Sequence, residues 1–461
     1  MRKICLYLVF SLTFVVSALA QQSTVEIPVI KLNGSFGKEY QKGTVIIIQG
    51  KDTIRQAAKI KWRGGTTNGD DRHKRNYKIK FDNDIQLFGL RKDNNWILDA
   101  GQVDVFRLRN HIVTELWNDF ARKPYYYDEE PDLHTGVRGK VVEVYVNDEY
   151  RGIYSLTEAM DRKELKLKKF KAATIRGQLW KADDWNMTMM YDAPTDYDNT
   201  KERWEGFELK YPEIDDLTPS DYSTLVDAIK FVATSSDKDF REHVGEYFDL
   251  PVLEDYYIFL YVTCAVDNRG KNIYWAVYDK TNSHKLTLAV WDLDGTMGAS
   301  WLKTINSDFV SPDYDMWIGM NVLGRLQKLD VDDFNLNISK RYNECRKNVL
   351  SEKSLTARFE KYYDMLHHSG ADMREQQLWS GDSDVNGENI DFAMELQYIK
   401  QWIHNRLFFL DSKFSEATGI TSVQYQEKND IYDMRGIKVK EPLRAGIYIK
   451  NGRKIVVRKN E

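Results

Sequence analysis

The chain has 461 residues, of which 42% are hydrophobic, 13% aromatic and 30% charged, a composition typical of globular proteins rather than disordered or membrane-spanning chains. Its 66 Lys and Arg and 70 Asp and Glu residues give a formal net charge of −4, so it lacks the broad basic surface of a nucleic-acid-binding protein. Three cysteines are too few for a disulfide scaffold or a cysteine-based zinc ribbon.

Residues 1–20 have the pattern of a cleaved secretory signal peptide. Arg2 and Lys3 provide a positive start, a short apolar stretch follows, and Ala18 and Ala20 mark a cleavage site. The apolar stretch is too short to span a bilayer, and no later segment is a candidate transmembrane span. The sequence therefore predicts an exported protein in the periplasm, on the cell surface or outside the cell. A buried N-terminal strand is the alternative.

Residues 21–215 read mainly as β-structure, which predicts a β-rich N-terminal lobe. Short β-branched or alternating segments, bounded by turn residues, are typical of strands. The strand candidates are residues 45–48, 60–63, 77–81, 141–146 and 152–156, the last two forming a hairpin. One helix is predicted within this lobe, at residues 105–120, because an apolar residue recurs there at every fourth position.

Residues 216–415 read mainly as helical, which predicts a C-terminal lobe. A helix start is expected at Thr218 and Pro219, and the helix candidates that follow are residues 252–266, 320–368 and 390–414. A hairpin is expected from residues 272–279 and 285–291. Cys264 and Cys345 lie in apolar helical surroundings, which favours two buried thiols over one disulfide.

The predicted fold class is therefore α+β, with two lobes and a cleft between them. Residues 416–461 change character and form a small C-terminal β module, with a hairpin turn at Asn451 and Gly452. This tail resembles the modules that serve as secretion signals in some exported bacterial proteins.

A cluster of carboxylates and amides carries the chemistry. Asp267 and Asn272 are five residues apart, the spacing at which the catalytic loop of protein kinases places a proton-accepting Asp and a metal-binding Asn. Asp292 ends the apolar strand that follows, where a second metal ligand is required. Carboxylate and amide oxygens suit Mg²⁺ or Mn²⁺. A polar loop with Asx turns is the alternative interpretation.

The β-rich lobe contains a matching phosphate-binding pattern. Arg63, Gly64, Gly65, Thr66 and Thr67 follow a strand, and a basic stretch at residues 73–75 leads into the next one. Glycines allow backbone N–H groups to approach phosphates, and a lysine neutralises their charge. A hairpin with a solvated basic arm is the alternative.

These motifs, in this order, resemble the CotH kinase family of atypical secreted or spore-coat kinases. The first segment, Arg63 to Thr67 with Lys74 and Tyr77, resembles the family's RGxSS pattern and the lysine after it. The other matching segments are LFGL at 87–90, NWIL at 95–98, Arg109-Asn110, VEVYVN at 142–147, YRGIY at 150–154, Glu158, residues 267–272 and residues 291–294. The resemblance covers about residues 55–410.

The resemblance implies a role for each matching residue. Asp267 would be the catalytic Asp, and Asn272 and Asp292 would bind the metal, with Asp294 as a second candidate. Arg63, Gly64, Gly65 and Thr66 would contact the nucleotide. Lys74 is the first candidate for the phosphate-neutralising lysine, and Lys78 is the alternative; either could be a solvated strand lysine. Glu158 would lie near the nucleotide or end a hinge strand, and an ordinary salt bridge is its alternative.

The leading hypothesis is an exported kinase that transfers the γ-phosphoryl group of ATP to a protein Ser or Thr, or to a glycan hydroxyl, with Mg²⁺ or Mn²⁺. An inactive surface protein that binds a glycan or protein through the same fold is the alternative, motivated by the aromatic content and the β tail. A glycosidase that uses two of these carboxylates is a third hypothesis, which leaves Asn272 without a role.

Overall fold

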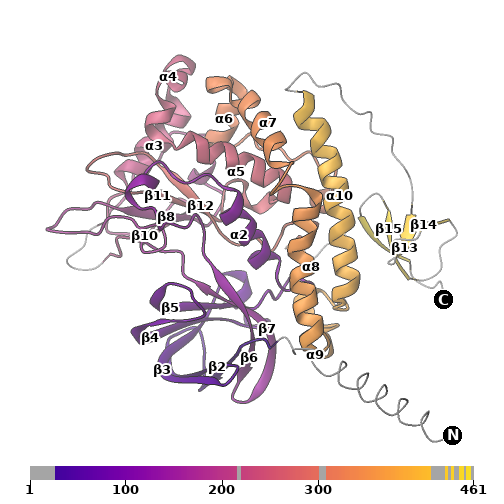
Figure 1. Cartoon of the computed structure of the whole chain (residues 1–461). Helices are drawn as coiled ribbons and strands as arrows, with labels where there is room; N and C mark the ends of the chain where they lie inside the picture. The colour runs from indigo at the N-terminus through magenta and orange to yellow at the C-terminus, as the bar shows by residue number, and fades with distance from the viewer. Residues whose placement is uncertain are drawn as a thin grey trace, which may run out of the picture.

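The computed structural model describes residues 26–214, 220–300 and 308–416, together with four short strands between residues 431 and 457. The arrangement is mixed α+β: a β-barrel lies at one end, a second sheet in the middle and a group of helices at the other end (Figure 1). The predicted signal peptide, residues 1–20, lies outside the described residues.

Seven strands of the described N-terminal range form a closed barrel in the order β1-β2-β3-β4-β5-β7-β6. The strands are β1 (Val29–Asn33), β2 (Gln41–Gln49), β3 (Asp52–Arg63), β4 (Asn76–Gln86), β5 (Lys92–Asp99), β6 (Gly139–Val146) and β7 (Glu149–Glu158). The barrel closes because β1 pairs with β2 on one side and, in parallel, with β6 on the other. The predicted strands and the hairpin of β6 and β7 are confirmed.

The barrel interior is packed with apolar side chains from alternate strand positions. These include Ile30, Val45, Ile60, Ile79, Trp96, Leu98, Val144 and Leu156. Closure removes free strand edges, and the filled interior stabilises the barrel as a packed core rather than a channel.

A second sheet has the strand order β12-β11-β8-β10-β9 within the described residues. Its strands are β8 (Gln178–Ala182), β9 (Arg203–Trp204), β10 (Phe207–Tyr211), β11 (Ile273–Val277) and β12 (Thr287–Val290). The predicted hairpin is confirmed as β11 and β12. Strand β11 also pairs with β8, so this sheet contains segments from both sides of the predicted lobe boundary at residue 215.

The helices of the described residues cover this second sheet and extend alongside the barrel (Figure 1). They are α2 (Arg109–Phe120), α3 (Ser223–Thr234), α4 (Asp237–Tyr247), α5 (Leu250–Thr263), α6 (Asn321–Leu329), α7 (Phe334–Cys345), α8 (Glu352–Ser369), α9 (Ala371–Trp379) and α10 (Phe392–Glu416). Helix α5 is apolar on nearly every face and lies in the main core, as expected for a fully buried helix.

The sequence predicted the positions of the helices better than their ends. The expected helical stretch at residues 320–368 is divided into α6, α7 and α8, because Asp330, Asp332 and Asp333 adopt left-handed backbone conformations between α6 and α7. The expected helix start at Thr218 and Pro219 lies outside the described residues. Cys264 and Cys345 are buried and free, as predicted.

Gly152 on β7 allows close contact between the barrel and α9. Its φ of +101° belongs to the region that favours glycine, and a Cβ at this position would lie 2.0 Å from Glu375 Oε2. The backbone N–H of Ile153 donates to the same oxygen at 2.7 Å. A glycine is therefore required for the buried carboxylate of α9 to reach β7.

Gly152→Ala is expected to lower the free energy of unfolding by at least about 2 kcal/mol, since the new methyl group strains the backbone and displaces a buried carboxylate. Urea unfolding followed by circular dichroism measures this. Gly37→Ala is the matched control, because a Cβ at Gly37 has no heavy atom within 4 Å. Equal stability of the two variants would show that Gly152 is not a packing requirement.

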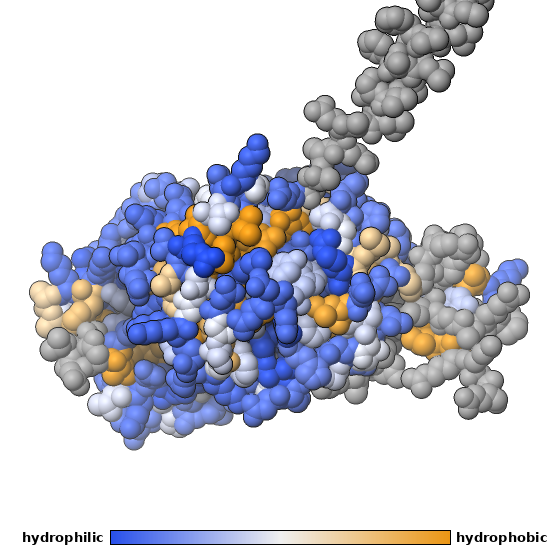
Figure 2. All heavy atoms as spheres, turned by 90° about the horizontal axis from the view of Figure 1, so that it is seen from below, coloured by the Kyte–Doolittle hydropathy of each residue, from blue (hydrophilic) through white to orange (hydrophobic). Residues whose placement is uncertain are grey.

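The surface of the described residues is mainly hydrophilic. Seen from the barrel end, it carries a larger hydrophobic patch and smaller ones among charged and polar side chains (Figure 2). Within the described ranges, no helix combines the length and the apolar character that crossing a membrane requires. The C-terminal strands β13 (Ile431–Asp433), β14 (Lys438–Val439), β15 (Gly446–Lys450) and β16 (Arg453–Val457) form a separate small sheet, as predicted, although the turn at Asn451 and Gly452 lies outside the described residues.

Candidate active site

Asp267 and Asn272 lie in the loop between α5 and β11. Asp267 belongs to a short 3-10 turn (Val266–Arg269), and Asn272 has a left-handed backbone immediately before β11. Asn272 Nδ2 donates to Asp267 Oδ2 at 2.9 Å, and Lys271 Nζ lies 3.1 Å from Asp267 Oδ1. The backbone N–H of Asn272 donates to the carbonyl of Ala182 on β8 at 2.7 Å. The loop is therefore held both by its own side chains and by the central strand of the sheet.

Asp292 follows β12, and a hydrogen-bond relay connects it to the barrel. The backbone N–H of Leu293 donates to Asn110 Oδ1 at 3.0 Å, and Asn110 Nδ2 donates to Asp99 Oδ2 at 2.6 Å. Asn110 lies at the start of α2, and Asp99 is the last residue of β5. Asn110 thereby joins the end of a barrel strand to the end of a strand in the second sheet.

Asp292 and Asp294 share a site with excess negative charge. Desolvation raises the pKa of Asp292. The positive charges of Lys181 and Arg63 lower this pKa, and the negative charge of Asp99 raises it further. Desolvation, together with the charges of Asp292 and Asp99, holds the pKa of Asp294 well above its ordinary value. Repelling carboxylates of this kind favour a cation between or beside them.

The charge of Asp292 also acts on Asp267. Desolvation raises the pKa of Asp267, and among the charges Lys271 opposes the rise while Asp292 adds to it. Asp292 keeps surface accessible to water although desolvation dominates its pKa, a combination expected for a side chain in a concave part of the surface. Asp267 and Asp292 therefore act within one electrostatic environment.

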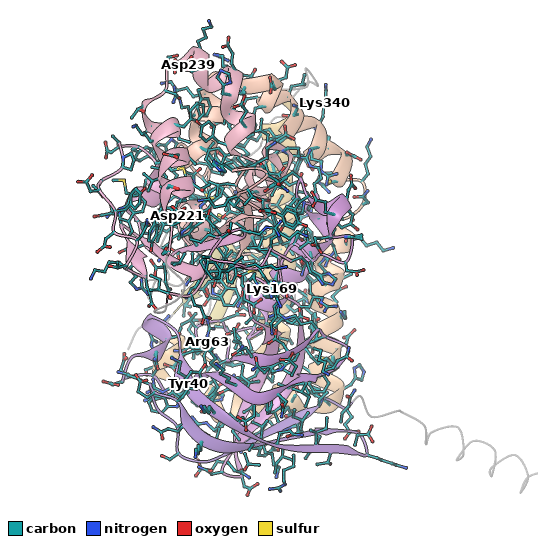
Figure 3. The ribbon with its side chains drawn as sticks, turned by 90° about the vertical axis from the view of Figure 1, so that its left-hand side faces the viewer. Tyr40, Arg63, Lys169, Asp221, Asp239 and Lys340 are labelled. Atoms are coloured by element: carbon teal, nitrogen blue, oxygen red, sulfur yellow. The ribbon has the colours of Figure 1, made fainter. Side chains whose placement is uncertain are left out.

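Two cations, Arg63 and Lys181, act on Asp292, and a third, Lys78, lies within electrostatic range of Arg63. The guanidinium carbon of Arg63 lies 5.4 Å from the centre of the Trp291 ring, next to Asp292, and Figure 3 shows Arg63 at the barrel end nearest the rest of the molecule. Desolvation lowers the pKa of Lys78, and the charge of Arg63 lowers it further. Desolvation also lowers the pKa of Lys181, and the negative charge of Asp292 raises it. Because no described carboxylate forms an ion pair with Lys78 or Lys181, both can interact with an incoming anion.

Lys74, the first candidate for phosphate binding, lies in another environment. It is completely buried, and its Nζ donates to Glu375 Oε1 and to the carbonyl of Ile153, each at 2.7 Å. Arg107 Nε donates to the same Glu375 oxygen at 2.7 Å. This geometry assigns Lys74 to the contact between barrel and α9 and favours the alternative, Lys78, for a phosphate.

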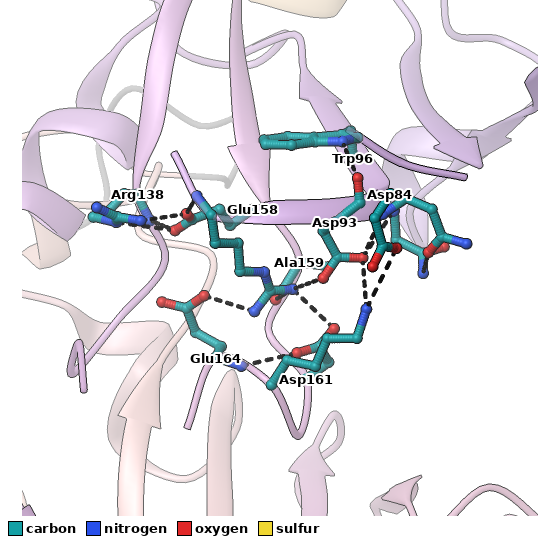
Figure 4. A network of polar contacts seen from close by, with 12 residues as sticks. Asp84, Asp93, Trp96, Arg138, Glu158, Ala159, Asp161 and Glu164 are labelled. Carbon is teal, nitrogen blue, oxygen red and sulfur yellow. Dashed lines mark hydrogen bonds and ion pairs between the residues drawn. The ribbon is translucent and has the colours of Figure 1, made fainter. Parts of the chain in front are cut away.

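Glu158 lies at the end of β7 in a network of buried ion pairs (Figure 4). Its oxygens accept from the backbone N–H of Arg91 at 2.7 Å and from Arg138 Nη2 at 2.7 Å and Nε at 3.2 Å. Arg91 in turn binds Asp161 and Glu164. The placement favours the salt-bridge alternative, because the carboxylate is buried and already satisfied. Its predicted contact with a nucleotide remains a prediction.

The glycine-rich turn follows β3, directly after Arg63. Gly64 has φ +118°, and a Cβ there would lie 1.9 Å from Thr67 Oγ1, so only glycine fits. Gly65 is exposed with open space around its Cα. The side chain of Thr66 is outside the described atoms. Asn76 Nδ2 donates to Thr67 Oγ1 at 3.3 Å, which ties the turn to β4.

Sequence reasoning missed two contributors to this site, Lys181 and Asp99. Both are single charged residues in ordinary alternating strands, and neither belongs to a recognisable spacing pattern. Asn110 belongs to the Arg109-Asn110 pair that matches the family pattern, but the sequence alone predicts no role for it. Strand pairing brings Lys181 near Asp292, because β8 and β12 both pair with β11, whereas Asp99 of the barrel is connected to the same region through Asn110.

The donor set fits a magnesium-type cation bound together with a phosphate. Within the described ranges, no group of three His, Cys, Asp or Glu side chains is arranged to hold a metal alone. Mg²⁺ usually takes one or two carboxylates plus substrate phosphate oxygens and water. Asn272 and Asp292, with Asp294 as a further candidate, provide hard oxygen ligands of that kind.

Most of the chain, including the residues of this site, matches a known protein family. Residues 60–410 match the family described as CotH kinase protein, so the chain belongs to the CotH kinase family. Membership indicates an atypical kinase, and therefore a phosphotransferase that uses ATP. A search of curated proteins found no match for the chain.

Proposed function

We propose that this protein is an exported kinase in which the barrel and the helical region act as the two lobes of a kinase-like fold. It transfers the γ-phosphoryl group of ATP to the hydroxyl of a protein Ser or Thr, or of a glycan. The observation that carries the proposal is the hydrogen bond between Asn272 and Asp267, in electrostatic range of Asp292. The predicted signal peptide supports export.

In the proposed reaction, Asp267 accepts the proton of the acceptor hydroxyl. The hydroxyl oxygen forms a bond to the γ-phosphorus, and the bond from that phosphorus to the ADP oxygen breaks. A raised pKa suits Asp267 for this role, because a base works best when its pKa approaches the working pH. The Asn272 amide orients the carboxylate.

Arg63, Lys78 and Lys181 would bind the phosphates of the nucleotide. The charges of Arg63 and Lys181 act on Asp292, and Lys78 lies within electrostatic range of Arg63, so the three cations can compensate for the charge of the phosphates. A divalent ion, when bound by Asn272 and Asp292, would supply charge compensation for the transferred group. Gly64 and Gly65 would leave room for phosphates close to the backbone.

The direct test is thermal unfolding of the purified full chain with ATP and either Mg²⁺ or Mn²⁺. We expect the melting temperature to rise with ATP and metal together, because a ligand that binds only the folded state stabilises it. Lys181→Met is expected to reduce this rise. If ATP with metal leaves the melting temperature unchanged, the kinase proposal is wrong.

Metal binding is expected to strengthen with pH. The folded-state pKa values of Asp292 and Asp294 are raised, so their contribution to stability is full below the unfolded pKa and is lost as pH rises through the folded pKa. A divalent cation offsets this loss and competes with protons for the same oxygens. The stabilisation by Mg²⁺ or Mn²⁺ should therefore increase as the pH rises above about 4, the ordinary pKa of an aspartate. Calorimetric melting of wild type and Asp292→Asn across this range measures it, and a pH-independent shift would contradict it.

The second candidate function is an inactive surface protein that binds a glycan. One observation favours it: Trp185 and Trp317 are exposed rather than buried in the core. Glycan binding by the purified chain, with no response to ATP and metal, would favour this function over catalysis.

A further inference from the structure

Three exposed aromatic side chains gather beside the candidate active site. Trp185, Tyr191 and Trp317 expose 37%, 49% and 59% of their surface. Trp185 and Tyr191 belong to the segment after β8, and Trp317 belongs to the segment before α6. Exposed aromatic residues that group together on a soluble protein mark binding surfaces. We call these three residues the aromatic platform.

Arg269 holds the aromatic platform together. Its Nη1 donates to the carbonyl of Trp317 at 2.8 Å, and its guanidinium carbon lies 5.9 Å from the centre of the Trp185 ring. The hydroxyl of Tyr191 donates to the carbonyl of Gly319 at 3.2 Å. The two segments are therefore joined through hydrogen bonds and a cation–π contact.

Two glycines let the rings approach the backbone closely. A Cβ on Gly319 would be 2.1 Å from Trp317 Nε1, and a Cβ on Gly270 would be 2.9 Å from Trp185 Cζ3. The indole rings thus lie close to glycine backbone and keep part of their surface exposed to water. Rings positioned in this way lose little conformational freedom when a ligand stacks on them.

The platform is continuous with the predicted catalytic loop. Arg269 and Gly270, which hold the platform, lie between Asp267 and Asn272 in the chain. Asn321 Nδ2 donates to the carbonyl of Arg269 at 2.7 Å, which fixes the segment that carries Trp317 to the same loop. One loop therefore carries Asp267, the carboxylate proposed to accept the proton, and holds the platform.

The chemistry of the platform fits a sugar ring. The electron-rich face of an indole attracts the polarised C–H groups on one face of a pyranose ring. Arg269 can donate to sugar hydroxyls at the platform's edge. A peptide that binds by adding a strand requires an open strand edge, and the neighbouring strand β8 has none, because it pairs with β10 and β11.

We propose that the aromatic platform binds the phosphoryl acceptor and that this acceptor is a glycan, whose ring stacks on Trp185 and Trp317. Tyr191 completes the surface. This inference rests on the proposed kinase function for the role of acceptor, while the binding of the sugar itself stands without it.

The test measures binding of short β-linked oligosaccharides of glucose and of N-acetylglucosamine to the purified full chain, by calorimetry and tryptophan fluorescence. The compared proteins are wild type, Trp185→Ala/Trp317→Ala and Phe408→Ala, which removes an exposed aromatic ring of α10 outside the platform. We expect at least one oligosaccharide to bind wild type and Phe408→Ala, and its affinity to fall at least about tenfold in the double variant. Equal melting temperatures of the three proteins show that folding is intact; if the double variant does not fold, Trp317→Ala alone replaces it.

Several outcomes would overturn the inference. If binding persists in the double variant, the platform is not the binding site. If no oligosaccharide binds wild type, the proposed ligand is not a glycan. A pool of Ser- and Thr-containing peptides that is phosphorylated in a platform-dependent way would identify a protein acceptor instead. Failure of the kinase proposal is distinguishable: glycan binding that depends on Trp185 and Trp317 would remain, with no thermal response to ATP and metal.

Discussion

Asp267→Asn is expected to lower phosphoryl transfer by about 10²- to 10⁴-fold while the protein stays folded. The amide has the same shape as the carboxylate but cannot accept the proton of the acceptor hydroxyl. It still offers an oxygen to the Asn272 amide, which lies 2.9 Å from Asp267 Oδ2 in the wild type. Transfer from radiolabelled ATP to the bound acceptor, or to the protein itself, measures the effect.

The fold should tolerate this change because the carboxylate is costly in its present surroundings. Burial raises the pKa of Asp267, which means that the folded state disfavours its charge. Asp364→Asn, at an exposed position of α8, is the matched control and should keep full activity. A fully active Asp267→Asn protein would remove Asp267 from the mechanism.

Lys74→Met is expected to reduce the free energy of unfolding by about 3–5 kcal/mol, the range observed when one partner of a buried ion pair is removed. Lys74 and Glu375 are both fully buried, so the loss leaves the Glu375 carboxylate with Arg107 as its remaining cation and removes the Lys74 donor from the carbonyl of Ile153. Urea unfolding of the full chain gives the difference.

Lys78→Met separates this structural role from nucleotide binding. Lys78 has no ion-pair partner among the described residues, and desolvation lowers its pKa, so its removal should cost little stability. It should instead reduce the thermal stabilisation by ATP with metal. The opposite pattern, with Lys74→Met stable and unable to bind ATP, would restore Lys74 as the phosphate-binding lysine.

Local sequence pattern was a good guide to the elements that hold the candidate site. The alternation at residues 77–81 and the four-residue periodicity at 105–120 predicted β4 and α2, because period-two and period-3.6 patterns report which face is buried. The family pattern predicted a site at Asp267, Asn272 and Asp292, and the structure places Asn272 in hydrogen-bond contact with Asp267 and Asp292 within its electrostatic range. Helix ends were less accurate, since the left-handed residues between α6 and α7 depend on tertiary contacts.

The partners of charged residues could not be predicted in the same way. Lys74 and Lys78 are four residues apart in one basic segment, and both are plausible phosphate ligands by composition. Their surroundings differ because Glu375 approaches Lys74 from α9, 301 residues later in the chain. Glu158 is similar, since Arg91 and Arg138 reach it from different parts of the barrel.

The sequence by itself determined the family, the order of β-rich and helical regions and the loop that contains Asp267 and Asn272. Each of these depends on residues close together in the chain or on an ordered series of motifs. Only the tertiary structure decided that β1 closes a barrel, that Lys181 and Asp99 join the site, and that Trp185 and Trp317 meet around Arg269. Long-range strand pairing and loop packing bring such residues together, and neither leaves a periodic trace in the sequence.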